Sequence, residues 1–123
     1  MKPMKNKLLT LSAILLALLF LAANSSYAQE AEEAAKIQYL IRSVEGLQGV
    51  KFVRNGSEYD AAKAADHLRF KLKKAGSRVK TAEDFIQLCS KSYLSGEAYT
   101  MRFPDGTAIT AETFFHQRLK EFK

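Results

Sequence analysis

The first 28 residues have the pattern of a secretory signal peptide, and this pattern limits the folded protein to the residues that follow. Residues 1–7 carry lysines and no acid, and residues 8–23 form an apolar run. Ser26-Tyr27-Ala28 then places small residues at the two positions that signal peptidases read. We therefore expect cleavage after Ala28, export, and a mature chain that begins at Gln29.

The apolar run could instead remain as a membrane anchor. It is shorter than the roughly 20 residues that cross a bilayer core, and the small residues before position 29 favour cleavage. No later stretch is long and apolar enough to span a membrane. We therefore expect a soluble product with no stable membrane insertion.

The mature chain has the size of one small domain, residues 29–123, or 123 − 28 = 95 residues. All 13 acidic residues lie in it, whereas three of the 19 lysines and arginines leave with the leader, so its net charge is 16 − 13 = +3. A nucleic-acid-binding domain would show a larger and more clustered basic excess. The composition therefore argues against a nucleic-acid partner.

Cys89 is the only cysteine, so it has no partner for an intramolecular disulfide. A free cysteine is most often a small buried core residue, and we expect this for Cys89. The alternative is an intermolecular disulfide or a reactive thiol, but no histidine lies nearby in sequence to lower the pKa of the thiol.

Hydrophobic periodicity predicts a first helix over residues 30–44. Glu30, Glu32 and Glu33 would occupy its first turn, where the helix dipole favours negative charge. Three-four spacing places one apolar stripe on this helix: Ile37, Leu40, Ile41, Val44 and Leu47.

The rest of the chain alternates short strands with helices. A strand over 50–54 ends at the turn dipeptide Asn55-Gly56, and Ser57–Asp60 resembles a capping box that opens a helix to about Lys74. Thr81 starts a third helix, residues 97–103 and 107–109 form a hairpin, and Thr110 caps a last helix. The predicted fold class is α+β, with about four helices and a small antiparallel sheet of one short strand plus a hairpin.

Several short motifs together resemble the YfeK-like family of short exported Gram-negative proteins. They are Phe52-Val53-Arg54-Asn55-Gly56, Tyr59, His67-Leu68-x-x-Lys71, Ala82-Glu83-x-Phe85-Ile86, Ser90-Lys91-Ser92 and Ser95-Gly96-x-x-Tyr99. The resemblance runs from about residue 37 to residue 119. It implies a periplasmic location and a single domain of unknown function, and it supplies no reaction, substrate or cofactor.

The second predicted helix has apolar residues on two sides. Ala61, Ala65, Leu68 and Leu72 share one face, and Tyr59 and Phe70 fall nearly opposite. Either both faces are buried, or Tyr59 and Phe70 form an exposed patch for a protein partner.

A basic stripe lies between those faces: Lys63, His67, Lys71 and Lys74. Such a stripe is usually solvated. If Arg54 folds onto it, Arg54, His67 and Lys71 could hold a carboxylate or a phosphate. The structural alternative is that Arg54 pairs with Glu83 or Asp84, and that Asn55 serves only the turn.

No pattern indicates catalysis, a metal or a cofactor. Neither His67 nor His116 has a second ligand at metal spacing, and Ser77-x-x-Lys80 lies between predicted helices without a companion motif. The leading hypothesis is a non-enzymatic periplasmic interaction module. Its predicted contact residues are Arg54, Asn55, Tyr59, His67, Phe70 and Lys71. The alternative is a small-molecule or anion-binding domain with a pocket around Arg54 and His67.

Overall fold

The computed structural model describes residues 2–123, with side chains described for residues 13–19 and 24–123. The chain divides into two units, one ending at Glu32 and one comprising Glu33–Lys123. Helix α1 (Lys2–Glu45) runs through both units. Its part up to Glu32 makes up the first unit, in which every described side chain is exposed. By length and composition, the stretch Ala13–Glu45 could cross a membrane, a property that signal sequences share.

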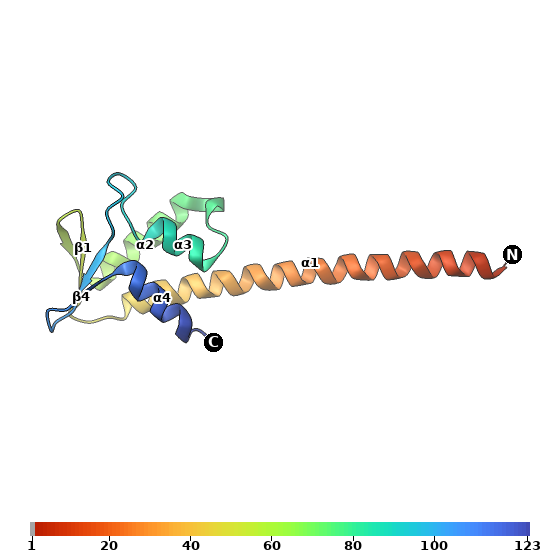
Figure 1. Ribbon diagram of the computed structural model, residues 1–123, viewed down its shortest axis with the longest axis horizontal. Coiled ribbons are helices and arrows are strands. Elements are labelled where there is room, and N and C mark those ends of the chain that lie inside the picture. The colour runs from red at the N-terminus through yellow and green to blue at the C-terminus, as the bar shows by residue number, and fades with distance from the viewer. Residues whose placement is uncertain (1) are drawn as a thin grey trace. The chain divides into compact units, whose positions relative to one another are not determined.

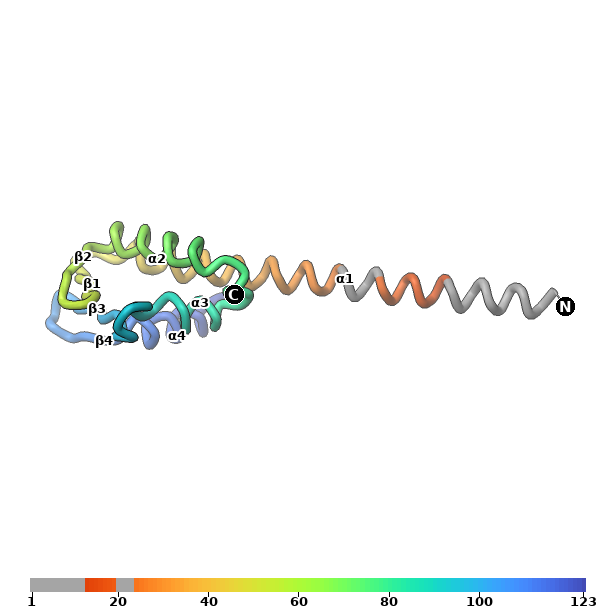
Figure 2. Tube along the Cα trace, turned by 90° about the horizontal axis from the view of Figure 1, so that it is seen from above, coloured from red at the N-terminus to blue at the C-terminus, as the bar shows by residue number. Residues whose placement is uncertain are grey.

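The second unit is an α+β domain, as the sequence predicts. After α1 come β1 (Lys51–Arg54), β2 (Ser57–Tyr59), α2 (Ala61–Ala75), a 3-10 turn η1 (Gly76–Arg78) and α3 (Ala82–Cys89). The chain ends with β3 (Thr100–Arg102), β4 (Ala108–Thr110) and α4 (Ala111–Glu121). Figure 1 shows these elements along the chain. In Figure 2, α2 lies on one side of this domain, α3 and α4 on the other, and the strands at one end.

The strands form one antiparallel sheet in the order β2-β1-β3-β4. Phe52 of β1 lies opposite Tyr59 of β2 and Met101 of β3. Directly opposed residues share a face, so all three side chains point to the same side of the sheet. Helix α2 contacts β1, and α4 contacts β4.

The sheet has one strand more than the sequence predicts. Residues 57–59 form β2 rather than the start of a capping box, because Asn55 (φ 48°) and Gly56 (φ 80°) make a two-residue turn that returns the chain beside β1. Positive φ at both turn residues is the geometry that keeps two twisted strands paired. Helix α2 is capped instead by Asp60, whose side chain accepts from the Lys63 amide.

The first helix also differs from the prediction. It begins at Lys2, so Glu30, Glu32 and Glu33 do not form its first turn in the full chain. Its predicted apolar stripe is confirmed: Ile37, Leu40, Ile41 and Val44 are buried, and Leu47 packs against them.

The core is continuous across the helices and the sheet. Phe85 of α3 and Phe115 of α4 are fully buried, with ring centroids 5.5 Å apart. Cys89 is also fully buried, as the sequence predicts, and burial raises the pKa of its thiol to about 11. Tyr99, just before β3, and Met101 within it are also buried, which fits the strand predicted over residues 97–103.

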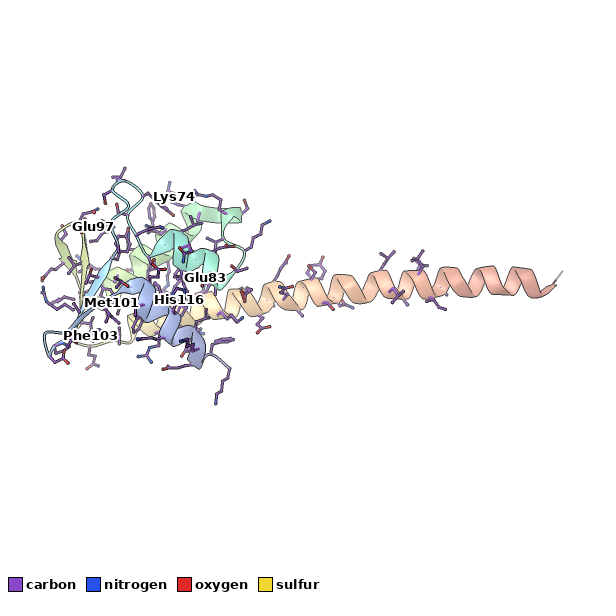
Figure 3. The ribbon with its side chains drawn as sticks, in the orientation of Figure 1. Lys74, Glu83, Glu97, Met101, Phe103 and His116 are labelled. Atoms are coloured by element: carbon purple, nitrogen blue, oxygen red, sulfur yellow. The ribbon has the colours of Figure 1, made fainter. Side chains whose placement is uncertain are left out.

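Polar contacts stabilise the start of α3 and join α3 to α4. Thr81 caps α3, as predicted, and forms a capping box with Asp84. Glu83 accepts from His116 Nε2 at 2.9 Å, and the two side chains lie together between the helices (Figure 3). Glu83 therefore bonds a residue of α4, and Asp84 bonds the start of its own helix.

A matched pair of variants tests the assignment of the core. Phe85→Ala should lower the free energy of unfolding by about 3–5 kcal/mol, because it leaves a cavity in a fully buried site. Phe70→Ala makes the same chemical change at a side chain that is 56% exposed, and should cost less than about 1 kcal/mol. Urea unfolding followed by circular dichroism measures both. Equal costs would contradict this core.

Candidate functional site

The strand alternation that buries Phe52 also turns Arg54 toward the interior. Residues two apart on a strand share a face, so Phe52 and Arg54 point to the same side of the sheet. Tyr59 lies opposite Phe52 on β2, and Tyr99 lies two residues before Met101, which faces Phe52 from β3. A guanidinium and two phenols are thereby gathered on the face that is otherwise apolar.

Helix α2 adds two basic residues from the opposite side. His67 and Lys71 are four residues apart and therefore neighbours on one helix face. Lys71 also follows Leu68 by three residues, which places it on the buried stripe that includes Ala64, Leu68 and Ala75. Lys71 is only 3% exposed, so the expectation that this basic stripe is solvated is wrong at Lys71.

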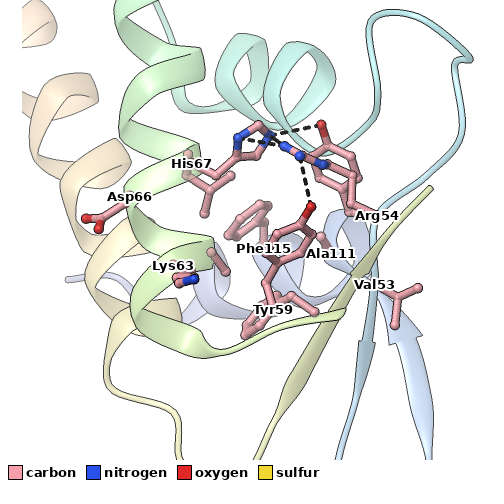
Figure 4. A pocket seen from close by; sticks show the side chains of 12 residues that line it. Val53, Arg54, Tyr59, Lys63, Asp66, His67, Ala111 and Phe115 are labelled. Carbon is pink, nitrogen blue, oxygen red and sulfur yellow. Dashed lines mark hydrogen bonds between the residues drawn. The ribbon is translucent and has the colours of Figure 1, made fainter. Parts of the chain in front are cut away.

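These five side chains form what we call the polar cluster: Arg54, Tyr59, His67, Lys71 and Tyr99. Arg54 Nη1 lies 2.8 Å from Nδ1 and 2.6 Å from Nε2 of His67. Arg54 Nη2 donates to Tyr59 Oη at 3.1 Å, and the guanidinium carbon lies 5.0 Å from the centre of the Tyr59 ring. Figure 4 shows Arg54 reaching from β1 to both partners.

Tyr99 connects the two basic residues of α2. Its hydroxyl lies 3.3 Å from His67 Nε2 and accepts from Lys71 Nζ at 2.9 Å. The ammonium also donates to the Lys91 carbonyl and lies 4.0 Å from the centre of the Tyr93 ring. These contacts solvate the buried charge. The pKa of Lys71 is nevertheless lowered to about 8, mainly by burial and in part by the charge of Arg54.

The electrostatics of the cluster keep His67 neutral near pH 7. Burial lowers its pKa to about 4, and the nearby charges of Arg54 and Lys71 act in the same direction. A neutral imidazole has one lone-pair nitrogen, so it can accept one hydrogen bond from Arg54. His67 is thus an acceptor in a group made mostly of donors.

The polar cluster contains more donors than acceptors. Each tyrosine oxygen accepts from a cation, which leaves its hydroxyl hydrogen available. Among the hydrogen bonds and ion pairs of the described side chains, no carboxylate contacts Arg54 or Lys71. The predicted alternative, in which Arg54 pairs with Glu83 or Asp84, is therefore wrong. Glu83 contacts His116, and Asp84 caps α3.

A cavity of about 270 Å³ lies beside the polar cluster. Arg54, Tyr59, His67 and Tyr99 line it together with core and surface residues: Phe52, Val53, Lys63, Ala64, Asp66, Leu68, Ala111 and Phe115. Asp66 is exposed, bonds Arg69 and points away from Arg54 (Figure 4). The predicted pocket around Arg54 and His67 is therefore present.

Three of the six predicted contact residues lie outside the cavity lining: Lys71, which belongs to the polar cluster, and Asn55 and Phe70, which do not. Asn55 donates to Ser92 Oγ at 3.3 Å and accepts from Ser95 Oγ at 3.0 Å, which ties the β1–β2 turn to the segment after α3. Phe70 is exposed, and Lys74 Nζ lies 5.5 Å from the centre of its ring. The interpretation in which both sides of α2 are buried is thus wrong at Phe70, and Tyr59 belongs to β2.

Sequence reasoning missed Tyr99, Ala111 and Phe115 as residues of this site. Alternation in the predicted strand 97–103 puts Tyr99 on the same face as Met101, and a tyrosine hydroxyl requires a hydrogen-bonding partner where it is buried. That requirement, together with the place of Tyr99 in the motif Ser95-Gly96-x-x-Tyr99, is the signal that could have identified it. In the part of the chain with described side chains, no group of three or more His, Cys, Asp or Glu residues could hold a metal ion.

The pKa of His67 leads to a test by pH. Between pH 7 and pH 5, the unfolded chain takes up a proton near pH 6.5, whereas folded His67 stays neutral until about pH 4. The unfolded state then binds more protons, so stability falls as the pH falls. We expect the urea midpoint to drop less in His67→Gln than in the wild type over this range. Equal drops would contradict a neutral, cluster-bound His67.

Comparison with known proteins places this chain in a family. Residues 31–123 match the family described as "Family of unknown function (DUF5329)". The chain is 36% identical over 70 residues to the "Uncharacterized protein YfeK" of Salmonella typhimurium, covering 56% of this chain and 58% of that protein. The match thus spans less than two thirds of the relative, and no solved structure matches. The chain belongs to the DUF5329 family, which confirms the predicted YfeK-like resemblance.

Proposed function

We propose that this protein is a non-enzymatic binding domain for a small anionic ligand. The observation that carries this proposal is the excess of donors at the cavity: Arg54 bonds the Tyr59 hydroxyl and a neutral imidazole but no carboxylate. A guanidinium without a counter-ion is costly beside an apolar cavity, and an anionic ligand supplies the missing acceptor.

The shape of the site favours a ligand over a protein partner. A small molecule requires a concave and mostly apolar pocket with a few convergent polar groups. The cavity matches that description, since buried Phe52, Leu68 and Phe115 form walls next to the polar cluster. This choice reverses the order of our two hypotheses from the sequence.

A protein-interaction surface remains the second candidate because three large apolar side chains are exposed within the unit Glu33–Lys123. They are Phe70, Tyr93 and Leu94, of which Leu94 is 98% exposed. Lys71 lies against the Tyr93 ring, and Phe70 precedes Lys71 on α2. These residues lie outside the cavity lining, so the two candidate functions can be tested separately.

The ligand-binding proposal is tested by titrating the purified protein with acetate, inorganic phosphate and phenylpropanoate. Binding should shift the NMR signals of His67, and Arg54→Gln should weaken it about tenfold or more, since a charge-assisted hydrogen bond contributes roughly 1.5–3 kcal/mol.

Two controls accompany this titration. Arg42→Gln removes the same charge from an exposed site on α1, and Phe70→Ala alters the exposed apolar surface; both should bind like the wild type. Wild-type affinity in Arg54→Gln, or no response to any of the three anions, would contradict the proposed function.

We further propose that the domain acts in the periplasm after removal of residues 1–28. The support is the sequence pattern of the leader and the exposed, apolar character of the helix at its described positions. No described side chain before Glu33 contributes to the core.

Mass spectrometry of the periplasmic fraction should find a protein that begins at Gln29. Ala28→Phe should leave uncleaved precursor, because a bulky side chain does not fit at the cleavage position. Ala34→Phe, an exposed position beyond the cleavage site, should be processed normally. A mature protein that retains residues 1–28 would rule out this proposal.

A further inference from the structure

The cavity has two chemically different ends. At one end lie the guanidinium of Arg54, the hydroxyl groups of Tyr59 and Tyr99, and the imidazole of His67. The remaining wall is largely apolar and comes from core side chains, which are Phe52, Ala64, Leu68, Ala111 and Phe115. A ligand that satisfies both ends carries its charge at one end and an apolar body at the other.

The volume limits the size of that apolar body. A dry cavity of about 150 Å³ accommodates benzene, so a cavity of about 270 Å³ has room for nearly twice as much. An inorganic anion would leave most of this space empty against Phe52 and Phe115, whereas a long-chain lipid would exceed it. By proportion to benzene, the fit is a compact molecule of about ten non-hydrogen atoms.

The charge of the polar end favours a carboxylate over a phosphate. Arg54 is the cation that reaches both Tyr59 and His67, and its planar fork matches the two oxygens of a carboxylate. Lys71 is separated from this end by the Tyr99 hydroxyl, and it supports an anion without being a lining residue. Lys63 and Asp66 also line the cavity from α2 with opposite charges; both are exposed, and Asp66 is paired with Arg69.

We infer that the pocket binds a monocarboxylic acid with a compact apolar body, its carboxylate on Arg54 and Tyr59 and its body against Phe52 and Phe115. This inference rests on the proposed function and adds the chemical class of the ligand. The bound carboxylate accepts the hydrogen bonds that the polar cluster leaves unused, and burial of the apolar body supplies the greater part of the affinity.

The test compares phenylpropanoate with its neutral amide, with acetate and with inorganic phosphate, using the full purified protein. We expect phenylpropanoate to bind at least tenfold more tightly than the other three. Its carboxylate should also raise the pKa of His67 measured by NMR. The second histidine, His116, bonds Glu83 and does not line the cavity, so its NMR signals should not respond to the ligand.

Two variants separate the charge from the apolar contact. Arg54→Gln should bind phenylpropanoate and its amide equally weakly. Ala64→Leu fills the cavity from α2 and should abolish phenylpropanoate binding while Arg54 stays in place, with circular dichroism verifying the fold. If Ala64→Leu does not fold, Ala64→Val provides the same test with a smaller side chain.

Two failures can be told apart. If acetate or phosphate binds through Arg54 as tightly as phenylpropanoate does, the ligand class is overturned and the anion-binding function stands. If none of these compounds shifts His67, both the ligand class and the proposed function are overturned.

Discussion

The two-residue alternation of β1 is the constraint on which the site depends. Phe52 must face the core because it packs between Tyr59 and Met101 in the sheet. Arg54, two residues later, is then directed to the same face. The turn at Asn55-Gly56 adds β2 and places the Tyr59 hydroxyl within reach of the guanidinium. The hydrophobic packing of the sheet thereby brings a charge to the edge of the core.

On α2, packing likewise places the charged side chain of Lys71 inside the protein. Its place on the buried stripe of α2 removes the ammonium from water, and two tyrosine rings, a hydroxyl and a backbone carbonyl replace part of that solvation. The result is a low pKa for a lysine and a chain of contacts from Lys71 through Tyr99 to His67. Arrangements of this kind are uncommon in purely structural cores and are frequent at functional sites.

Most of the elements could be predicted because their signals are local. The apolar stripe at Ile37 and Leu40, the capping box at Thr81 and the alternation around Met101 each depend on residues close in sequence. Strand β2 was missed because its three residues have no periodicity of their own and pair only once the preceding turn has formed. The burial of Lys71 was missed because a lysine was assigned to the solvated side by residue type, although its spacing from Leu68 places it inside.

The sequence by itself determined the α+β class. It also predicted a leader followed by one domain, and it led to the hypothesis that Arg54 lies against α2. The tertiary structure alone decided which side chains meet. Tyr99 directly precedes β3, and Ala111 and Phe115 lie on α4. All three are far along the chain from Arg54, and no local pattern links them to it. The register of the sheet and the packing of the helices set these contacts. As a result, the basic residues of α2 lie beside a cavity that has one polar end and one apolar end.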